Sequence, residues 1–208
     1  MVDKRTWNNM SGIQDILLEE SHAPPLQHVY TNAGSGTETI PGPSPVTYST
    51  VIIELWGPSG AGGPGTGIDG SQGGGGASGS YCKSSYSVSG SAGKTMSYTI
   101  GTPGVNSTIS SGTFTISIMT SPYGNFGSAP VSGSGGIGGI GGGVATGGNV
   151  INSNGNAGEN GDTNGVRGGL GGPAIVGQYA SGYSGSNGTY GPTDIPGRNG
   201  VISFTYLQ

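Results

Sequence analysis

Two glycine-rich tracts, at residues 57–76 and 133–172, limit what this chain can fold into. The first tract holds 11 glycines in 20 residues, and the second holds 18 in 40. Glycine loses more conformational freedom on folding than any other residue, so such tracts stay disordered unless specific contacts hold them. With so few side chains available, those contacts must form between backbones.

The second tract has a local period of three. The sequence GGIGGIGGG places Ile137 and Ile140 three residues apart, and Gly155, Gly158 and Gly161 follow the same step. Three residues per turn is the geometry of the polyproline-II helix, which has no internal hydrogen bonds. Its N–H and C=O groups must therefore bond to neighbouring segments. We predict ordered glycine-rich loops that are partly polyglycine-II-like.

Outside the tracts the pattern changes to a period of two, with many β-branched and aromatic residues, which is typical of strands. The predicted strands are residues 27–32, 36–40, 47–56, 80–88, 95–101, 112–120 and 201–207. In residues 112–120, Phe114, Ile116 and Ile118 would lie on one face. The fold class is therefore all-β, a small antiparallel β-sandwich.

Residues 1–25 differ in composition and form a predicted N-terminal arm, whereas residues 26–208 form a glycine-rich β-domain. Ser11 suits a helix N-cap, and the segment 22–25 ends in two prolines that stop a helix. An apolar stripe this short cannot form its own core. The arm docks either onto its own domain or, as an assembly anchor, into a larger particle. The candidate anchor residues are Trp7, Ile13, Ile16 and Leu17.

Composition excludes several classes of function. Charged residues make up 8% of the chain, the net charge is −4, and the six Lys and Arg are scattered singly. Nothing here suggests binding to nucleic acid or to an anionic membrane. The single Cys82 excludes an internal disulfide and is expected to be a small packed side chain. The first residues lack the apolar run of a signal peptide, so we expect synthesis in a cytoplasm.

No motif supports catalysis, a cofactor or a metal. The segment Gly93–Thr95 resembles the end of a phosphate-binding loop, but Val88 stands where that motif needs its first glycine. We predict a hairpin turn there, with Gly90 and Gly93 at positive φ. Neither His22 nor His28 is accompanied by a cluster of Cys, Asp or Glu at metal-ligand spacing, and Glu54 has no visible carboxylate partner.

Aromatic residues among Gly, Ser and Asn are the candidate contact sites. Tyr179, Tyr183 and Tyr190 lie in the sequence GQYASGYSGSNGTYGPT, and Tyr123 and Phe126 lie in SPYGNFGS. Binding loops use this residue mixture to combine rigid aromatic contacts with adaptable hydrogen bonds. Two interpretations stay open: the rings cover glycine backbone locally, or Tyr183, Tyr190, Tyr123 and Phe126 grip a sugar or a protein.

The order of these elements resembles the glycine-rich domain of phage tail-fibre and related virion proteins. In that family a strand like VIIELWG runs directly into polyglycine. The segments GGGGASGSYCKSSYSVSGSAGKTMSYTIG and RNGVISFTY resemble its next unit and its last strand. The resemblance covers roughly residues 29–207 and leaves the arm outside.

The resemblance implies a β-sandwich with a glycine-rich region at one end. In T-even type tail-fibre adhesins, similar glycine-rich segments form packed polyglycine-II helices whose connecting loops touch the host surface. We expect a non-enzymatic tail-fibre or receptor-binding component whose partners are other virion proteins, copies of itself and a host glycan or protein. A capsid decoration protein or a self-assembling filament subunit is the alternative.

Overall fold

The computed structural model describes residues 24–42, 46–65, 71–131, 134–163, 168–173 and 196–208. The sequence predictions that fall outside this part concern the arm residues Trp7, Ile13, Ile16 and Leu17, and the tyrosines Tyr179, Tyr183 and Tyr190. The described residues contain strands and extended segments and no helix.

The larger of two antiparallel sheets, sheet A, has the strand order β1-β9-β3-β4-β8. Its strands are β1 (Leu26–Tyr30), β3 (Thr50–Trp56), β4 (Tyr81–Ser87), β8 (Ile151–Ser153) and β9 (Val201–Leu207). The apolar run of β3 predicts a central strand, and β3 does pair on both sides, with β4 and β9.

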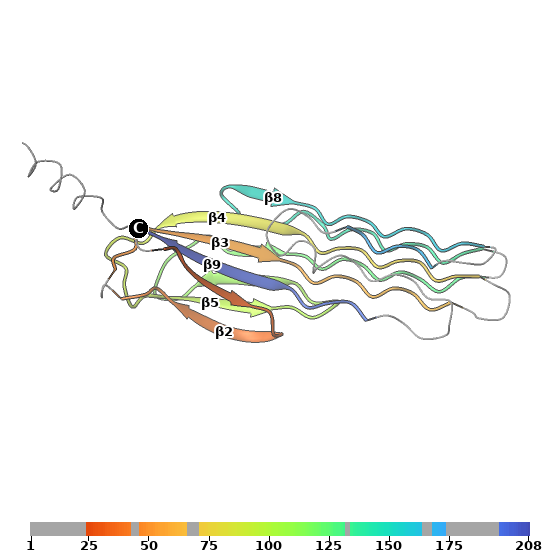
Figure 1. Cartoon of the computed structure of the whole chain (residues 1–208), viewed down its shortest axis with the longest axis horizontal. Coiled ribbons are helices and arrows are strands. Elements are labelled where there is room, and N and C mark those ends of the chain that lie inside the picture. The colour runs from red at the N-terminus through yellow and green to blue at the C-terminus, as the bar shows by residue number, and fades with distance from the viewer. Residues whose placement is uncertain (1–23, 43–45, 66–70, 132–133, 164–167, 174–195) are drawn as a thin grey trace, which may run out of the picture.

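The smaller sheet B has the order β2-β5-β6-β7 and forms the lower layer in Figure 1. Its strands are β2 (Gly34–Thr39), β5 (Thr95–Ile100), β6 (Ser107–Ser111) and β7 (Met119–Ser121). Inward-facing residues of both sheets share one apolar core, which includes Val51, Ile53 and Phe204 of sheet A and Met96 and Ile109 of sheet B. The predicted antiparallel β-sandwich is confirmed.

The predicted strand over residues 112–120 is wrong for most of its length. The sheet instead uses β6 and the short β7, and the chain turns between them. The Ser111 hydroxyl both accepts from the N–H of Ile116 and donates to its carbonyl, at 3.0 and 2.9 Å. The Ser111 side chain takes the hydrogen bonds that the backbone of Ile116 would otherwise make to a neighbouring strand, and so closes a turn. As a result Ile116 is buried, whereas Ile118 is 65% exposed.

The turn at Gly90 and Gly93 has the predicted positive φ at both glycines, of 67° and 78°. It does not close a hairpin, because β4 belongs to sheet A and β5 to sheet B. The connection crosses between the layers, and Gly93 donates to the carbonyl of Ile40 at 2.9 Å.

Candidate functional site

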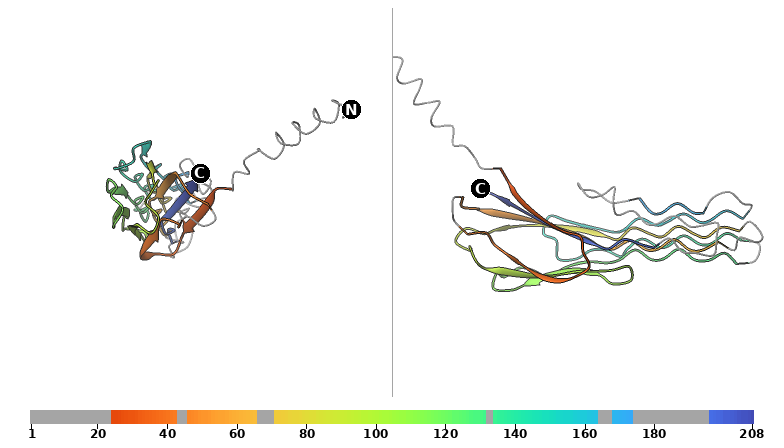
Figure 2. Two further views of the ribbon diagram at one scale, coloured as in Figure 1. Left: turned by 90° about the vertical axis from the view of Figure 1, so that its left-hand side faces the viewer. Right: turned by 60° about the horizontal axis from the view of Figure 1, so that its bottom comes forward.

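The most unusual part of the molecule is a bundle of extended segments that continues from one end of the sandwich (Figures 1 and 2). We call it the glycine bundle. It comprises residues 57–65, 71–80, 122–130, 134–143, 154–163, 168–173 and 196–200. β3 runs directly into the segment 57–65, and the segment 71–80 runs directly into β4. These two segments therefore continue the strands of sheet A into the bundle.

The segment 71–80 lies at the centre of the bundle, and every one of its residues is buried. Its backbone bonds repeat every third residue. The N–H groups of Gly74, Ala77 and Ser80 donate to residues of the segment 122–130 at 2.9–3.0 Å. The carbonyls of the same three residues accept from the segment 57–65. A step of three is the period of the polyproline-II helix, whose backbone groups point outward.

The remaining positions of the central segment bond to three further segments. Gln72, Gly75 and Ser78 donate to the segment 154–163 and accept from the segment 134–143, and Gly73 and Gly76 accept from the segment 168–173. The central segment is thus bonded to five neighbours. Buried backbone polar groups need partners, and here the neighbouring segments supply them without a hydrophobic core.

Glycine is required where the segments meet. A Cβ atom built on Gly74 would overlap the carbonyl of Ile137, and one built on Gly75 would overlap that of Leu170. The same holds for Gly127 against Gly74. The residues that carry large side chains in the segment 134–143 are Ile137 and Ile140, and both point outward, with 68% and 72% of their surface exposed.

The end of the bundle away from the sandwich is its distal end. Because the segment 57–65 leads away from β3, its last residues lie at that end, where Gly63 donates to the carbonyl of Gly74 at 2.8 Å. The segments 122–130, 134–143, 154–163 and 168–173 bond there to Gln72, Gly73 and Gly74 of the central segment. Six described segments therefore begin or end at the distal end.

Of the predicted contact residues, Tyr123 and Phe126 lie within the bundle and not on a loop. Tyr123 is near the sandwich and partly buried, and its N–H donates to the Asn106 side chain at 3.3 Å. Phe126 is 52% exposed farther out. It borders a hollow of about 460 Å³ whose lining includes Pro64, Pro103 and Pro196. Because Tyr123 and Phe126 are three residues apart, they lie on the same ridge of the segment 122–130.

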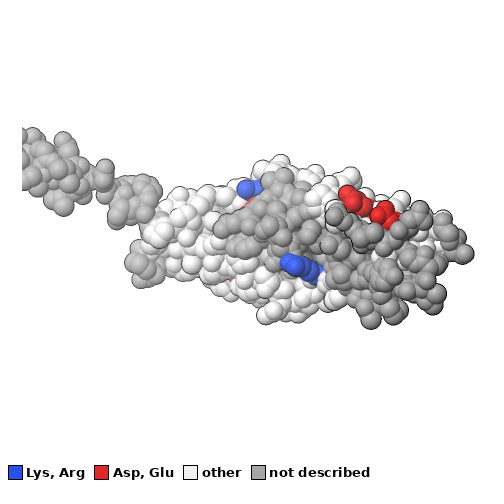
Figure 3. Space-filling view, turned by 45° about the vertical axis from the view of Figure 1, so that its right-hand side comes forward, with Lys and Arg blue, Asp and Glu red and all other residues white. Residues whose placement is uncertain are grey.

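Acidic side chains mark one side of the bundle, visible as the red atoms in Figure 3. Glu159 and Asp162 are exposed and three residues apart, so they lie on the same ridge of their segment. The sequence could have indicated this pair. The glycines at 155, 158 and 161 mark one face of the period-three segment, so Glu159 and Asp162 lie together on another face.

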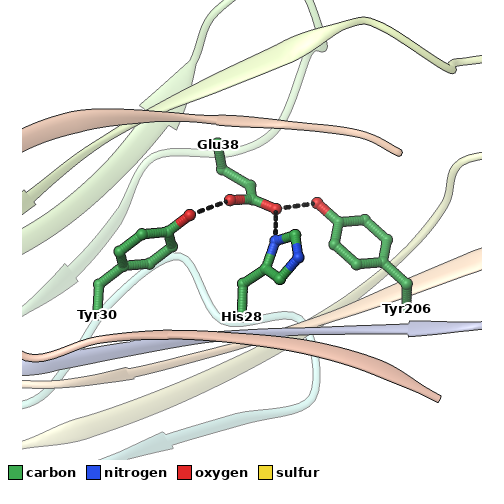
Figure 4. A network of polar contacts seen from close by, with 4 residues as sticks. All are labelled: His28, Tyr30, Glu38 and Tyr206. Atoms are coloured by element: carbon green, nitrogen blue, oxygen red, sulfur yellow. Dashed lines mark hydrogen bonds and ion pairs between the residues drawn. The ribbon is translucent and has the colours of Figure 1, made fainter. Parts of the chain in front are cut away.

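A buried carboxylate ties the two sheets together (Figure 4). Glu38 of β2 accepts from Tyr206 and His28 at 2.7 and 2.8 Å through Oε1, and from Tyr30 at 2.7 Å through Oε2. Burial, together with the hydrogen bond to Glu38, raises the pKa of Tyr30 and of Tyr206 well above the usual range. The protein groups that engage its acceptors make Glu38 a tie between β2 of sheet B and β1 and β9 of sheet A.

A second pair of ionisable groups lies on the outer face of sheet A. Tyr81 donates to Glu54 Oε1 at 2.6 Å, and Lys83 Nζ lies 3.8 Å from the same oxygen. Trp56 packs against Tyr81, with 5.0 Å between ring centroids. The sequence analysis did not find the partners of Glu38 and Glu54, because these contacts depend on how separate strands are placed, and no local pattern reveals that placement.

The described residues contain no group of three or more His, Cys, Asp or Glu side chains placed to hold a metal ion. Cys82 is buried, as predicted, and burial raises the pKa of its thiol to about 12. Within the same residues no helix is long and apolar enough to cross a membrane. Comparison of the sequence with known protein families and with curated proteins finds no match.

Proposed function

We propose that this protein is a non-enzymatic virion component, a phage tail-fibre or receptor-binding subunit that contacts the host surface. One observation carries the proposal: the glycine bundle bonds its central segment to five neighbours and brings the ends of six described segments together at its distal end. A scaffold of this kind serves a binding surface, because the described backbone that leads to the contact residues is held in place before binding. The resemblance to the glycine-rich domain of tail-fibre proteins supports the same reading.

In this proposal the sandwich connects to the particle and the bundle projects from it. The loops of the two glycine-rich tracts and the tyrosines Tyr183 and Tyr190 make contact through backbone groups, hydroxyls and aromatic rings. The partner is a glycan or a protein of the host surface. The arm, residues 1–25, anchors the chain to other virion proteins or to further copies.

A structural role, as a capsid decoration protein or a filament subunit, is the second candidate. The exposed Ile137 and Ile140, with Val144 at 59% exposure beyond them, form an apolar ridge that suits an assembly contact. Electron microscopy of the purified full chain separates the two functions, because a filament subunit forms ordered arrays on its own and a receptor-binding subunit stays dispersed.

The test of receptor binding uses the two tyrosines that the sequence favours. We expect Tyr183→Ala and Tyr190→Ala each to weaken binding to host cells by about 1–3 kcal/mol, as for aromatic anchors in other interfaces. The measurement is the affinity of labelled protein for cells that the parent phage infects. Phe114→Ala would report on folding and not on contact, because Phe114 packs against the core.

Unchanged thermal unfolding of the two tyrosine variants is the necessary control. If both variants bind host cells as tightly as the original protein, the tyrosine contacts are wrong. If the original protein binds no host cell and forms ordered arrays, the structural role replaces the proposal.

A further inference from the structure

The outer face of sheet B carries hydroxyl side chains in register. Strand pairing aligns one residue from each of β2, β5, β6 and β7, and an isolated bridge adds a fifth from the segment after the glycine bundle. This first row consists of Ser35, Thr99, Thr108, Thr120 and Thr146.

A second row runs beside the first, two residues along each strand. It pairs Thr37 with Ser97 and Ser97 with Ser110. All of these side chains are exposed or partly exposed, and none carries a charge. The outer face of sheet A differs, because it carries the Glu54 and Lys83 pair. The lack of charge is therefore particular to the face of sheet B.

The two rows border a shallow hollow of about 470 Å³. Six of the eight residues that line it are Ser or Thr of these rows. Gly36 and Tyr98 complete the lining. The Tyr98 ring itself lies on the inner face of sheet B, where it packs against Tyr30 and Phe204. The hollow thus offers hydroxyls from both rows over a floor of strand backbone. Its volume lies in the range of small-ligand sites.

We propose that this hydroxyl face binds a neutral glycan. Each Ser or Thr hydroxyl donates one hydrogen bond and accepts two, which matches the hydroxyls of a sugar. Within a sheet such side chains repeat about every 4.8 Å across strands and about every 6.8 Å along them, so successive sugar residues meet the same pattern. A face without charge has no group to pair with a phosphate, a sulfate or a carboxylate.

The site is separate from the distal end of the glycine bundle, so it does not depend on the proposed receptor contacts there. A subunit with both sites would meet the host surface twice, once at the bundle tip and once along the sandwich. Weak binding at the second site would add to the first through effective concentration.

The test is chemical-shift mapping on the isotope-labelled full chain with neutral hexasaccharides of glucose and mannose: maltohexaose, cellohexaose and mannohexaose. We expect at least one of them, at millimolar concentration, to shift backbone signals of β2, β5 and β6. The double variant Thr99→Val/Thr108→Val removes two hydroxyls of the first row and keeps β-branched side chains of similar shape. We expect it to weaken binding about tenfold, the effect of losing one or two hydrogen bonds.

Thr102→Val is the matched control, because Thr102 is exposed in the turn after β5 and lies outside both rows; its affinity should not change. Thr37→Val, on the exposed edge strand, replaces the double variant if that variant unfolds. Any of four results would overturn the proposal: no shift with all three sugars, shifts only outside sheet B, equal affinity of the folded hydroxyl variants, or tighter binding of a sulfated hexasaccharide.

Discussion

At the scale of single residues, this molecule depends on side chains that are missing as much as on those that are present. Each buried glycine of the central segment lets a neighbouring backbone approach within hydrogen-bond distance. Gly75 donates to the carbonyl of Glu159 at 2.9 Å and accepts from Gly139 at 2.8 Å. An added methyl group there meets backbone atoms, which cannot move aside as a side chain can.

Gly75→Ala should therefore destabilise the protein by about 3 kcal/mol, at the upper end of the cost of overpacking a core. Gly143→Ala is its control, because a Cβ at Gly143 meets nothing within 4 Å and its φ is not positive. This second change should be neutral or stabilise by about 0.4–1 kcal/mol, since alanine restricts the unfolded chain. Urea unfolding measures both. Equal effects of the two changes would contradict close backbone packing.

Buried tyrosines and Cys82 make stability depend on alkaline pH. Burial raises the pKa of Cys82 to about 12 and lifts the pKa of Tyr206 and of Tyr81 far above the usual value. In the unfolded chain these groups ionise near their ordinary pKa, about 8.5 for Cys and about 10 for Tyr. Above those values the folded state binds more protons than the unfolded state, so the free energy of unfolding falls as pH rises.

We expect stability to hold constant from neutral pH to about pH 8 and then to decline up to the highest pH measured. Urea unfolding at a series of pH values gives the curve. Tyr206→Phe should reduce its slope above about pH 10, and Cys82→Ala should reduce the slope just above pH 8. A curve that stays flat to pH 11 would show that these groups titrate alike in both states.

At the scale of elements, a period of three decides which residues of a bundle segment face its neighbours, as a period of two does for the strands of the sheets. In the segment 134–143, Gly136, Gly139 and Gly142 face the central segment and are buried, while Ile137 and Ile140 point outward. If the segment 134–143 shifted its register by one residue, an isoleucine would face the central segment, where only the hydrogen of a glycine fits. A shift of three residues would place a glycine there again.

Deletion of Gly138 alone should therefore prevent folding of the bundle, whereas deletion of residues 138–140 should leave a folded protein that is shorter by one turn. A turn of this helix rises about 9 Å, so the shorter variant loses one rung of hydrogen bonds and keeps the phase of the rest. Soluble yield and thermal unfolding distinguish the two. If both deletions behave alike, the three-residue register does not control packing.

At the scale of the whole molecule, the sandwich and the bundle are continuous, because strands of sheet A run into bundle segments without a break. The described fold closes around its own core and its own backbone bonds. We expect neither to require the arm, residues 1–25. It is the part of the chain that our proposal assigns to assembly.

A chain that lacks residues 1–25 should thus fold with unchanged unfolding temperature but should not enter the parent particle. Incorporation is measured by complementing a phage that lacks the gene with the full or the shortened chain. Normal incorporation of the shortened chain would show that another surface anchors the protein. The apolar ridge of Ile137 and Ile140 is then the next surface to substitute.

Much of the sandwich could be predicted from the sequence, because alternation and apolar runs are local signals. They found β1, β2, β3, β4, β5 and β9 to within a few residues. They missed β6 and β8, whose sequences STISS and INS contain little apolar surface. They also overextended the strand at residues 112–120, since no local pattern reveals that the Ser111 hydroxyl closes a turn with Ile116.

The sequence by itself determined the all-β class, the two glycine-rich tracts and the outward phase of Ile137 and Ile140, because each depends on the spacing of neighbouring residues. Only the tertiary structure decided which segments bond to 71–80, that Glu38 meets His28, Tyr30 and Tyr206, and that hydroxyls align across sheet B. These contacts join residues far apart in the chain. The order in which strands and segments lie side by side decides these contacts. The repeat within one segment does not show which other segments lie next to it.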